Sequence, residues 1–315
     1  MGFESLLGNA RLKDNLQRSI RSGRTSHFYL ISGPAGSGKR TLARLLAAAL
    51  QCQSDQGPCL SCPACRKVMA DTHPDFITVI DPEHKNVAVK IVRAIRDDMF
   101  VRPNEGKKKI YLFPQEMGIE GQNALLKVLE EPPSYGVFIL LSENPEQLLP
   151  TVRSRAVELA MVGLSRAELL QALKKSHPDA GEEALEGAIF RSGGYLGQAL
   201  QLLEEGGSIP LQTEAFCDCF ARKDVLALVQ LLATMEKWKR DALLTQLSQW
   251  SGLLQQALMC HNGMPAATPL ARQLAEARSP YDLNRAIASL NKADEYLRGN
   301  VSPGAVCGWL SWELR

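Results

Sequence analysis

The segment between residues 33 and 41 carries the residue types that bind phosphate. It follows an apolar stretch at 27–32, contains three glycines and one lysine, and precedes the helix-forming run 41–50. Glycines let consecutive backbone N–H groups turn toward one anion, and the helix N-terminus and the lysine ammonium add positive charge. This order of strand, glycine loop, lysine and helix predicts a P-loop for ATP or ADP. The residues expected to bind the nucleotide are Gly33, Gly36, Ser37, Gly38, Lys39, Arg40 and Thr41.

This P-loop departs from the usual pattern at the position that binds magnesium. A serine or threonine normally follows the lysine and ligates Mg²⁺. Here Arg40 follows Lys39, and Thr41 comes one residue later. A shift of one residue turns a side chain by roughly 100° around a helix. We therefore expect the loop to hold phosphate, whereas hydrolysis stays open at this point.

A second departure lies at the end of the third expected strand, residues 107–113. In P-loop ATPases acidic residues at this position help to hold Mg²⁺ and align the attacking water. This strand instead runs into Pro114 and Gln115, and the first acid is Glu116. Two departures from different strands fall on the same metal site. We therefore predict that this chain hydrolyses little ATP by itself.

Four cysteines form a cluster with the spacing C-x6-C-x2-C-x2-C. Four thiolates within reach of one point suit a structural Zn²⁺, and a closed set of four sulfurs leaves no position for water. A redox role is less favoured, because a thioredoxin-type CxxC stands alone at a helix start. His73 and His84 lie nearby, but four thiolates already saturate the ion, so we expect ordinary surface or capping residues there. The predicted zinc ligands are Cys52, Cys59, Cys62 and Cys65.

The composition of the chain is that of an ordinary globular protein. It has 315 residues, of which 45% are hydrophobic and 22% charged, enough for two or three domains. A net charge of +2 does not indicate a nucleic-acid binder. No apolar stretch reaches the ~18 residues of a membrane helix, and we find no signal-peptide core. These features predict a cytoplasmic protein without membrane contact. The remaining cysteines are expected to be small buried hydrophobic residues: Cys217, Cys219, Cys260 and Cys307.

Strand-like and helix-like segments alternate over the first half of the chain, which predicts a parallel sheet with helical crossovers. The expected strands are 27–32, 77–80, 107–113, 137–142 and 156–161. Helices are expected at 4–23, 41–50, 86–99, 120–131 and 148–155.

Beyond residue 163 the sequence is helical. Ser165 and Glu168 have the spacing of a capping box at the start of a helix over 166–175. Two more helices are expected at 184–191 and 196–205. Gly206 and Gly207 then indicate a linker.

The order of these motifs resembles the AAA+ subunits of the bacterial DNA polymerase III clamp loader. The resemblance covers residues 1 to about 205 well and the remainder loosely. Its most specific parts are the cysteine cluster after the P-loop helix and the segment NALLKVLEEPP at 123–133. THPDF at 72–76 and FILLSENPEQLLPTVRSR at 138–155 add to it.

This resemblance implies a fold class and a division into domains. It implies an α/β P-loop AAA+ domain at 1–162, with a parallel sheet and a zinc-binding insertion at 52–65. A small helical lid at 163–208 and an all-α C-terminal collar at 209–315, which joins subunits, would follow.

Departures from the family pattern place the chain among its subunits with little ATPase activity. Besides Arg40 and Pro114-Gln115, the family's sensor-2 arginine is missing near 192–200, where Leu196, Gly197 and Gln198 stand. The family's SRC motif corresponds to Ser154, Arg155 and Ala156. The resemblance implies that the retained Arg155 completes a neighbouring subunit's ATP site as an arginine finger in trans.

The resemblance therefore predicts a hetero-oligomer with gamma/tau and delta subunits, within the DNA polymerase III holoenzyme. Such a complex loads the sliding clamp onto primed DNA at the expense of ATP. An alternative is a catalytically active, gamma/tau-like ATPase in which Thr41 or Glu116 restores the metal site. A third interpretation is a zinc-ribbon nucleic-acid binder with a vestigial P-loop, against which the near-neutral charge argues.

Overall fold

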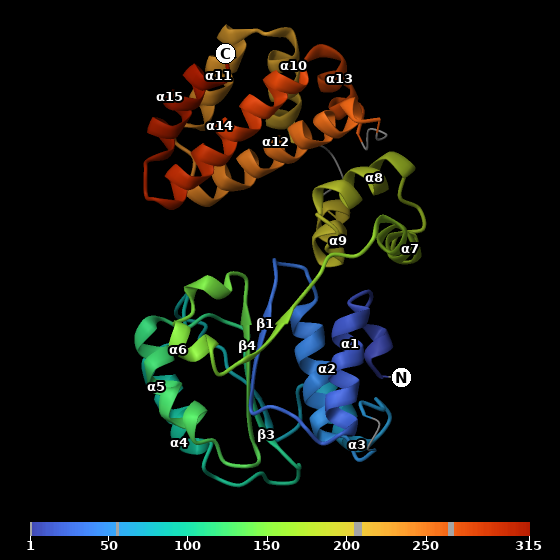
Figure 1. Cartoon of the computed structure of the whole chain (residues 1–315), viewed down its shortest axis with the longest axis vertical. Coiled ribbons are helices and arrows are strands. Elements are labelled where there is room, and N and C mark those ends of the chain that lie inside the picture. Colours follow the sequence, from blue (N-terminus) through green and yellow to red (C-terminus); the bar gives the residue numbers. More distant parts are fainter. Residues whose placement is uncertain (1, 55–56, 205–209, 264–267) are drawn as a thin grey trace. The chain divides into compact units, whose positions relative to one another are not determined.

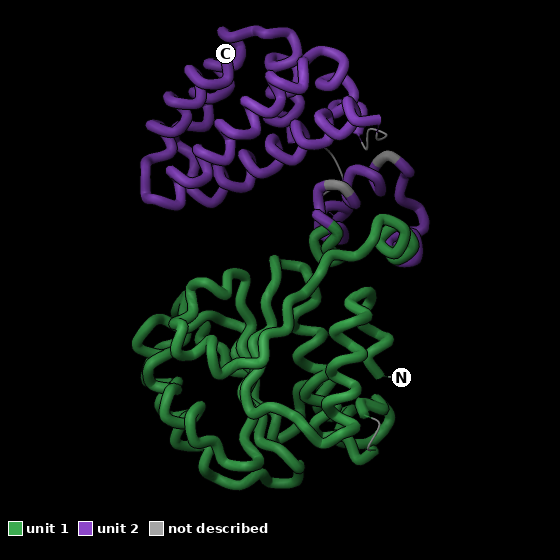
Figure 2. The backbone as a smooth tube through the Cα atoms, in the orientation of Figure 1, with its two compact units in different colours: residues 1–172, 194–198 green, residues 173–193, 199–315 purple. Residues whose placement is uncertain are grey.

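The computed structural model describes residues 2–54, 57–204, 210–263 and 268–315 (Figure 1). The chain forms two compact units, one of Met1–Ala172 with Gly194–Gln198, the other of Leu173–Gly193 with Ala199–Arg315 (Figure 2). The expected linker at Gly206 and Gly207 and the boundary between residues 208 and 209 lie outside the described residues. The division into three domains stays a prediction.

A parallel sheet forms the centre of the first unit. Within the described residues it has five strands in the order β2-β3-β4-β1-β5. Its central pair is in register from Phe28 opposite Phe138 to Ser32 opposite Ser142. Parallel neighbours require crossovers, and helices supply them, so the predicted α/β arrangement with a parallel sheet is confirmed. The strands are β1 Phe28–Ser32, β2 Phe76–Thr78, β3 Lys109–Phe113, β4 Gly136–Ser142 and β5 Val157–Ala160.

Helices cover both faces of this sheet (Figure 1). Tyr29 and Ile31 of β1 pack with α1, α2 and α3, whereas Phe28 and Leu30 pack with α4, α5 and α6. The alternation follows from the strand period of two residues. The helices up to residue 153 are η1 Gly2–Ser5, α1 Ala10–Arg21, α2 Lys39–Gln51, α3 Pro63–Met69, α4 Val89–Asp98, α5 Ile119–Glu130, η2 Pro145–Gln147 and α6 Pro150–Arg153. The next helix, α7 Arg166–Ser176, is divided between the two units after Ala172.

Most expected elements occur within a few residues of their predicted bounds, but the single helix over 4–23 is wrong. Gly8 and Asn9 have φ angles of 60° and 53°, and this left-handed backbone separates η1 from α1. The predicted capping box is confirmed. The backbone N–H of Ser165 donates to Glu168 Oε2 at 2.9 Å, and the N–H of Glu168 donates to Ser165 Oγ at 3.3 Å.

Helices alone make up the described part of the second unit. Its core contains Trp250, whose ring stacks on Phe216 with centroids 4.2 Å apart. Cys217, Cys219 and Cys307 are buried as expected, and Cys260 is partly exposed. In the described residues no helix is long and apolar enough to cross a membrane. The helices are α8 Glu182–Arg191, α9 Leu196–Glu204, α10 Leu211–Arg222, α11 Val225–Met235, α12 Arg240–His261, α13 Pro269–Ala277, α14 Pro280–Arg298 and α15 Pro303–Glu313.

The carboxylate of Asp75 organises the turn before β3. It accepts hydrogen bonds from the backbone N–H groups of Asn104 at 2.6 Å, Glu105 at 2.9 Å and Gly106 at 2.7 Å. Burial raises the pKa of Asp75, but these hydrogen bonds outweigh burial and the pKa lies below its ordinary value. The neighbouring His73 is buried, so of the two expected roles, surface or capping, only the capping one fits it. Its Nδ1 accepts from the N–H of Asp75 at 3.1 Å.

Replacing Asp75 tests this anchor. Asp75→Asn should lower the free energy of unfolding near pH 7 by about 2–3 kcal/mol, because a charged acceptor of several bonds becomes a neutral amide. The folded-state pKa is depressed, so the carboxylate stabilises fully above the unfolded value of 3.8 and loses this effect as pH falls through the folded value. Denaturant titrations at several pH values should therefore show wild type and variant converging below about pH 4.

The matched control is Asp97→Asn. Asp97 is exposed and pairs with its neighbour Arg96 on the surface of α4. Its replacement should change the unfolding free energy by less than about 0.5 kcal/mol. Equal losses from the two substitutions would contradict the anchoring role of Asp75.

Candidate nucleotide, metal and arginine sites

The glycine segment has the backbone of a P-loop. It leaves β1 after Ser32, and the N–H of Gly33 donates to the carbonyl of Ser142 at the end of β4, at 3.1 Å. Gly36 and Gly38 have φ angles of 70° and 90°, a conformation that other residues seldom adopt. The sequence therefore folds locally as predicted and brings the loop to the carboxyl edge of the sheet.

Lys39 is oriented over this loop. Its Nζ donates to the carbonyls of Gly33 at 2.5 Å and Pro34 at 2.7 Å, and burial lowers its pKa. The hydroxyl of Ser37 is buried and has no hydrogen-bond partner in the described part of the chain. A phosphate oxygen would supply that partner, so the loop fits a phosphate group.

The side chains of Arg40 and Thr41 make no hydrogen bond to the P-loop glycines within the described residues, whereas Lys39 does. Both residues are exposed at the start of α2, next to the fully buried Leu42. Their nucleotide-binding role, predicted from the motif, stays a prediction. The exposure of Thr41 agrees with the expectation that a one-residue shift turns its hydroxyl away from the usual magnesium position.

The first turn of α9 lies in the segment Gly194–Gln198, which belongs to the first unit, and packs on the P-loop of that unit. The N–H of Gly197 donates to the carbonyl of Gly36 at 3.0 Å. A Cβ atom on Gly197 would lie 2.7 Å from the Cα of Gly36, so glycine is required for this approach. The resemblance predicted the loss of an arginine near this segment, which stays a prediction, and it did not predict the structural role of Gly197.

An alanine at this position should disturb the contact. We expect Gly197→Ala to lower the free energy of unfolding by about 1–3 kcal/mol, because the new methyl group overlaps backbone atoms that cannot move as a side chain can. Gly187→Ala in α8 is the control, since no heavy atom lies within 4 Å of its added Cβ. That substitution should be neutral or stabilising in a helix. Equal melting temperatures for the two variants would disprove the requirement.

Gln115 takes the place of an acid after β3 and serves a structural purpose. Its Nε2 donates to the carbonyls of Asp81 at 3.2 Å and Lys85 at 2.7 Å, and also to that of His84. Its Oε1 accepts from the N–H of Asp81 at 2.9 Å. The amide thus fastens the segment 81–85, a role that requires both donor and acceptor atoms and that a carboxylate could not fill.

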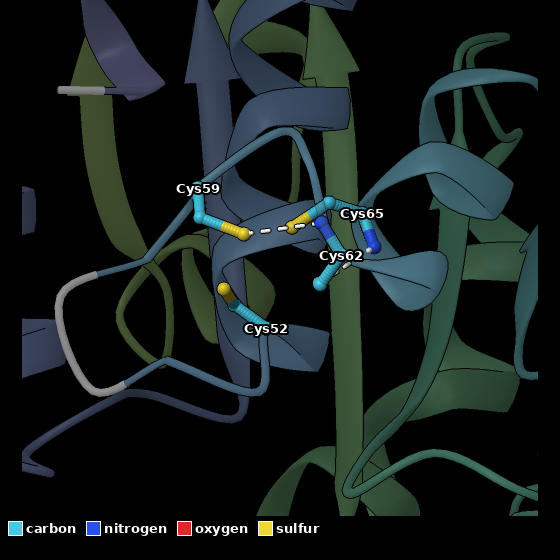
Figure 3. A group of neighbouring side chains, drawn as sticks. All are labelled: Cys52, Cys59, Cys62 and Cys65. Carbon is cyan, nitrogen blue, oxygen red and sulfur yellow. Dashed lines mark hydrogen bonds between the residues drawn. The ribbon is translucent and has the colours of Figure 1, made fainter.

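The four clustered cysteines converge although they come from three different segments. Cys52 follows α2, Cys59 lies in the connecting loop, and Cys62 and Cys65 lie at the start of α3 (Figure 3). Their Sγ atoms all lie within 4.8 Å of one another. A tetrahedral zinc site places its sulfurs about 3.8 Å apart, so this donor set fits such an ion after small adjustments. His73 and His84 do not belong to this group within the described residues.

Backbone N–H groups point at the sulfurs. Those of Ser54, Cys62 and Cys65 donate to the Sγ atoms of Cys52, Cys59 and Cys62 at 3.3–3.4 Å. Hydrogen bonds, led by that from the Ser61 side chain, lower the pKa of Cys59 to about 5. Burial instead raises the pKa values of Cys52 and Cys65. Backbone N–H donors of this kind stabilise the negatively charged thiolate, which is the form of cysteine that binds a metal ion.

Arg155 lies between the ends of α5 and α6. Its Nη2 forms an ion pair with Glu130 Oε1 at 2.5 Å, and its Nη1 donates to the carbonyl of Thr151 at 2.6 Å. Among the contacts of the described residues, none joins Arg155 to the P-loop of the same chain. Sequence reasoning missed Glu130, although it belongs to the NALLKVLEEPP segment that carried the resemblance.

Comparisons with known proteins agree with these motifs. A family model described as DNA polymerase III, delta subunit, matches residues 8–164. The DNA polymerase III subunit delta' of Pseudomonas aeruginosa is 41% identical over 176 residues, which cover 54% of this chain and 53% of that protein. The alignment thus spans about half the length of this relative.

Other similar proteins are gamma subunits. The DNA polymerase III subunit gamma of Buchnera aphidicola subsp. Schizaphis graminum is 28% identical over 270 residues, which cover 80% of this chain and 74% of that protein. Among solved structures, a gamma subunit-related protein of Thermotoga maritima has a TM-score of 0.46 at 17% identity, over 96% of this chain and 99% of that one.

Proposed function

We propose that the protein is a clamp-loader subunit of the delta-prime type, because the family model described as DNA polymerase III, delta subunit, matches its residues 8–164. It would assemble with gamma/tau and delta subunits and support the ATP-dependent loading of a sliding clamp onto primed DNA. The observation that carries this proposal is the 41% identity to a delta' subunit, together with retention of the P-loop.

The same site argues against efficient hydrolysis by this chain. Arg40 and the structural amide of Gln115 stand where a motor subunit would place groups that hold Mg²⁺, and the exposed Thr41 is turned away from that position. A bound nucleotide would have its phosphates held by Gly36, Gly38, Lys39 and Ser37, while Mg²⁺ would normally neutralise the charge that develops on them. Binding without turnover, of weak or moderate affinity, is the outcome that these residues favour.

A steady-state ATPase assay tests this proposal. The chain alone should turn over ATP at least about 100-fold more slowly than the motor subunits of its complex, because metal stabilisation is worth several kcal/mol. Adding it to its partner subunits should raise their DNA-stimulated ATPase activity. Turnover by the chain alone that matches a motor subunit and disappears in Lys39→Ala would favour the gamma/tau-like alternative.

For the cysteine cluster we propose one structural Zn²⁺ held by Cys52, Cys59, Cys62 and Cys65. The converging sulfurs and their N–H donors support it. The ion would join the end of α2 to α3 across the loop. With four thiolate ligands it would contribute to stability and take no part in catalysis.

Metal analysis of protein prepared without added zinc should find one equivalent per chain. Cys62→Ser should reduce this content and lower the melting temperature, because the ion stabilises the folded state that binds it. Cys260→Ser is the control, as Cys260 lies in α12 outside the cluster, and it should retain the metal. A content well below one equivalent that Cys62→Ser leaves unchanged would exclude the site.

A further inference from the structure

The ion pair between Glu130 and Arg155 joins the last residue of α5 to the residue that would act on a neighbouring ATP site. Both side chains are partly exposed, with 52% and 33% of their surfaces accessible. A carboxylate at a helix C-terminus faces the negative end of the helix dipole and is unfavourable there. The position of Glu130 therefore finds no explanation in the stability of α5 itself.

We propose that Glu130 is the counter-ion that holds Arg155 until a phosphate of a neighbouring subunit's nucleotide displaces it. The inference rests on the proposed function, in which Arg155 acts in trans. Nη2 donates to Glu130, whereas Nη1 is held separately by the carbonyl of Thr151. Exchange of Glu130 for a phosphate oxygen would therefore leave the guanidinium tethered at Thr151 and correctly placed.

The larger negative charge of a phosphate group favours its binding to Arg155 over that of the Glu130 carboxylate. Glu130 and a phosphate compete for the same guanidinium edge, and a carboxylate that stays beside the bound phosphate would repel it. An exposed ion pair is weak, so a multiply charged phosphate group can displace the carboxylate. Glu130 thus keeps Arg155 ordered in the free chain without withholding it from a partner.

Arg153, the last residue of α6 and two residues before Arg155, shows the contrast. It pairs with two carboxylates, Glu146 at 2.6 Å and Glu158 at 3.3 Å. Its charge is therefore more than balanced within the chain, whereas Arg155 has one acidic partner among the described residues. This difference selects Arg155 as the arginine available to a phosphate.

The test uses the complete reconstituted complex with DNA. ATPase activity is measured against the concentration of this subunit, giving a half-saturating concentration and a maximal rate. Glu130→Gln removes the charge but keeps the size of a half-exposed side chain, and Glu131→Gln is the matched control. Arg155→Ala, Arg153→Ala and the double variant Glu130→Gln/Arg155→Ala complete the set.

We expect Glu130→Gln to lower the half-saturating concentration by up to about fivefold, because Arg155 no longer has to leave an ion pair. The maximal rate should not change, and the gain should shrink as salt is raised. Glu131→Gln should behave as wild type. In the Arg155→Ala background the effect of Glu130→Gln should vanish, which a purely structural role would not predict.

These variants test the action of Arg155 in trans and the counter-ion role of Glu130 separately. If Arg155→Ala leaves the complex fully active, or has only the effect of Arg153→Ala, the role of Arg155 in trans is wrong. A second outcome is that Arg155→Ala lowers the rate, but Glu130→Gln changes the half-saturating concentration no more than Glu131→Gln does. Only the role of Glu130 is then overturned, and the same holds if the effect of Glu130→Gln persists in the Arg155→Ala background.

Discussion

Burial of the central strands on both faces of the sheet is the constraint on which the first unit depends. Phe28 and Leu30 pack toward one layer of helices, and Tyr29 and Ile31 toward the other. Each such side chain contributes about 1.5–3 kcal/mol when it is removed from water. No position within β1 or β4 is therefore free for chemistry. Residues that bind ligands must lie where the strands end, and the P-loop does so at the end of β1.

Two residues have structural roles in segments where the resemblance would place catalytic groups of a motor subunit. Gln115 uses its amide to hold the segment 81–85, and Gly197 allows α9 to approach Gly36. A carboxylate at the first position would lose the donated bonds, and an arginine at the second would not fit against the loop. The backbone of the P-loop is thus present, and the loss of the metal-binding chemistry of a motor subunit is our proposal.

The cysteine cluster is joined to the sheet by a continuous set of polar contacts. Lys107 Nζ donates to the carbonyl of Cys52 at 3.0 Å, and the Gln51 side chain donates to the carbonyl of Lys108 and accepts from its N–H. The same turn is anchored on its other side by Asp75. The end of α2, the cluster and the start of β3 are therefore held as one body, which suits a stabilising metal site.

Motifs that are defined by the spacing of residues along the chain could be predicted from the sequence. The P-loop, the four cysteines and the capping box of Ser165 and Glu168 are of this kind, because residues a few positions apart meet through local backbone geometry. The order of the strands and helices follows likewise from hydrophobic periodicity. The break at Gly8 and Asn9 escaped prediction, since the apolar spacing continues through it.

Tertiary structure decided the contacts between residues distant in sequence. The burial of His73, the approach of Gly197 to Gly36 and the pairing of Glu130 with Arg155 depend on how helices pack against the sheet. Helical periodicity identifies the buried side of α5, but it does not say which basic group lies beside that helix's last carboxylate. That choice is made when α5 and α6 pack on the same face of the sheet, and it determines which arginine keeps a single acidic partner.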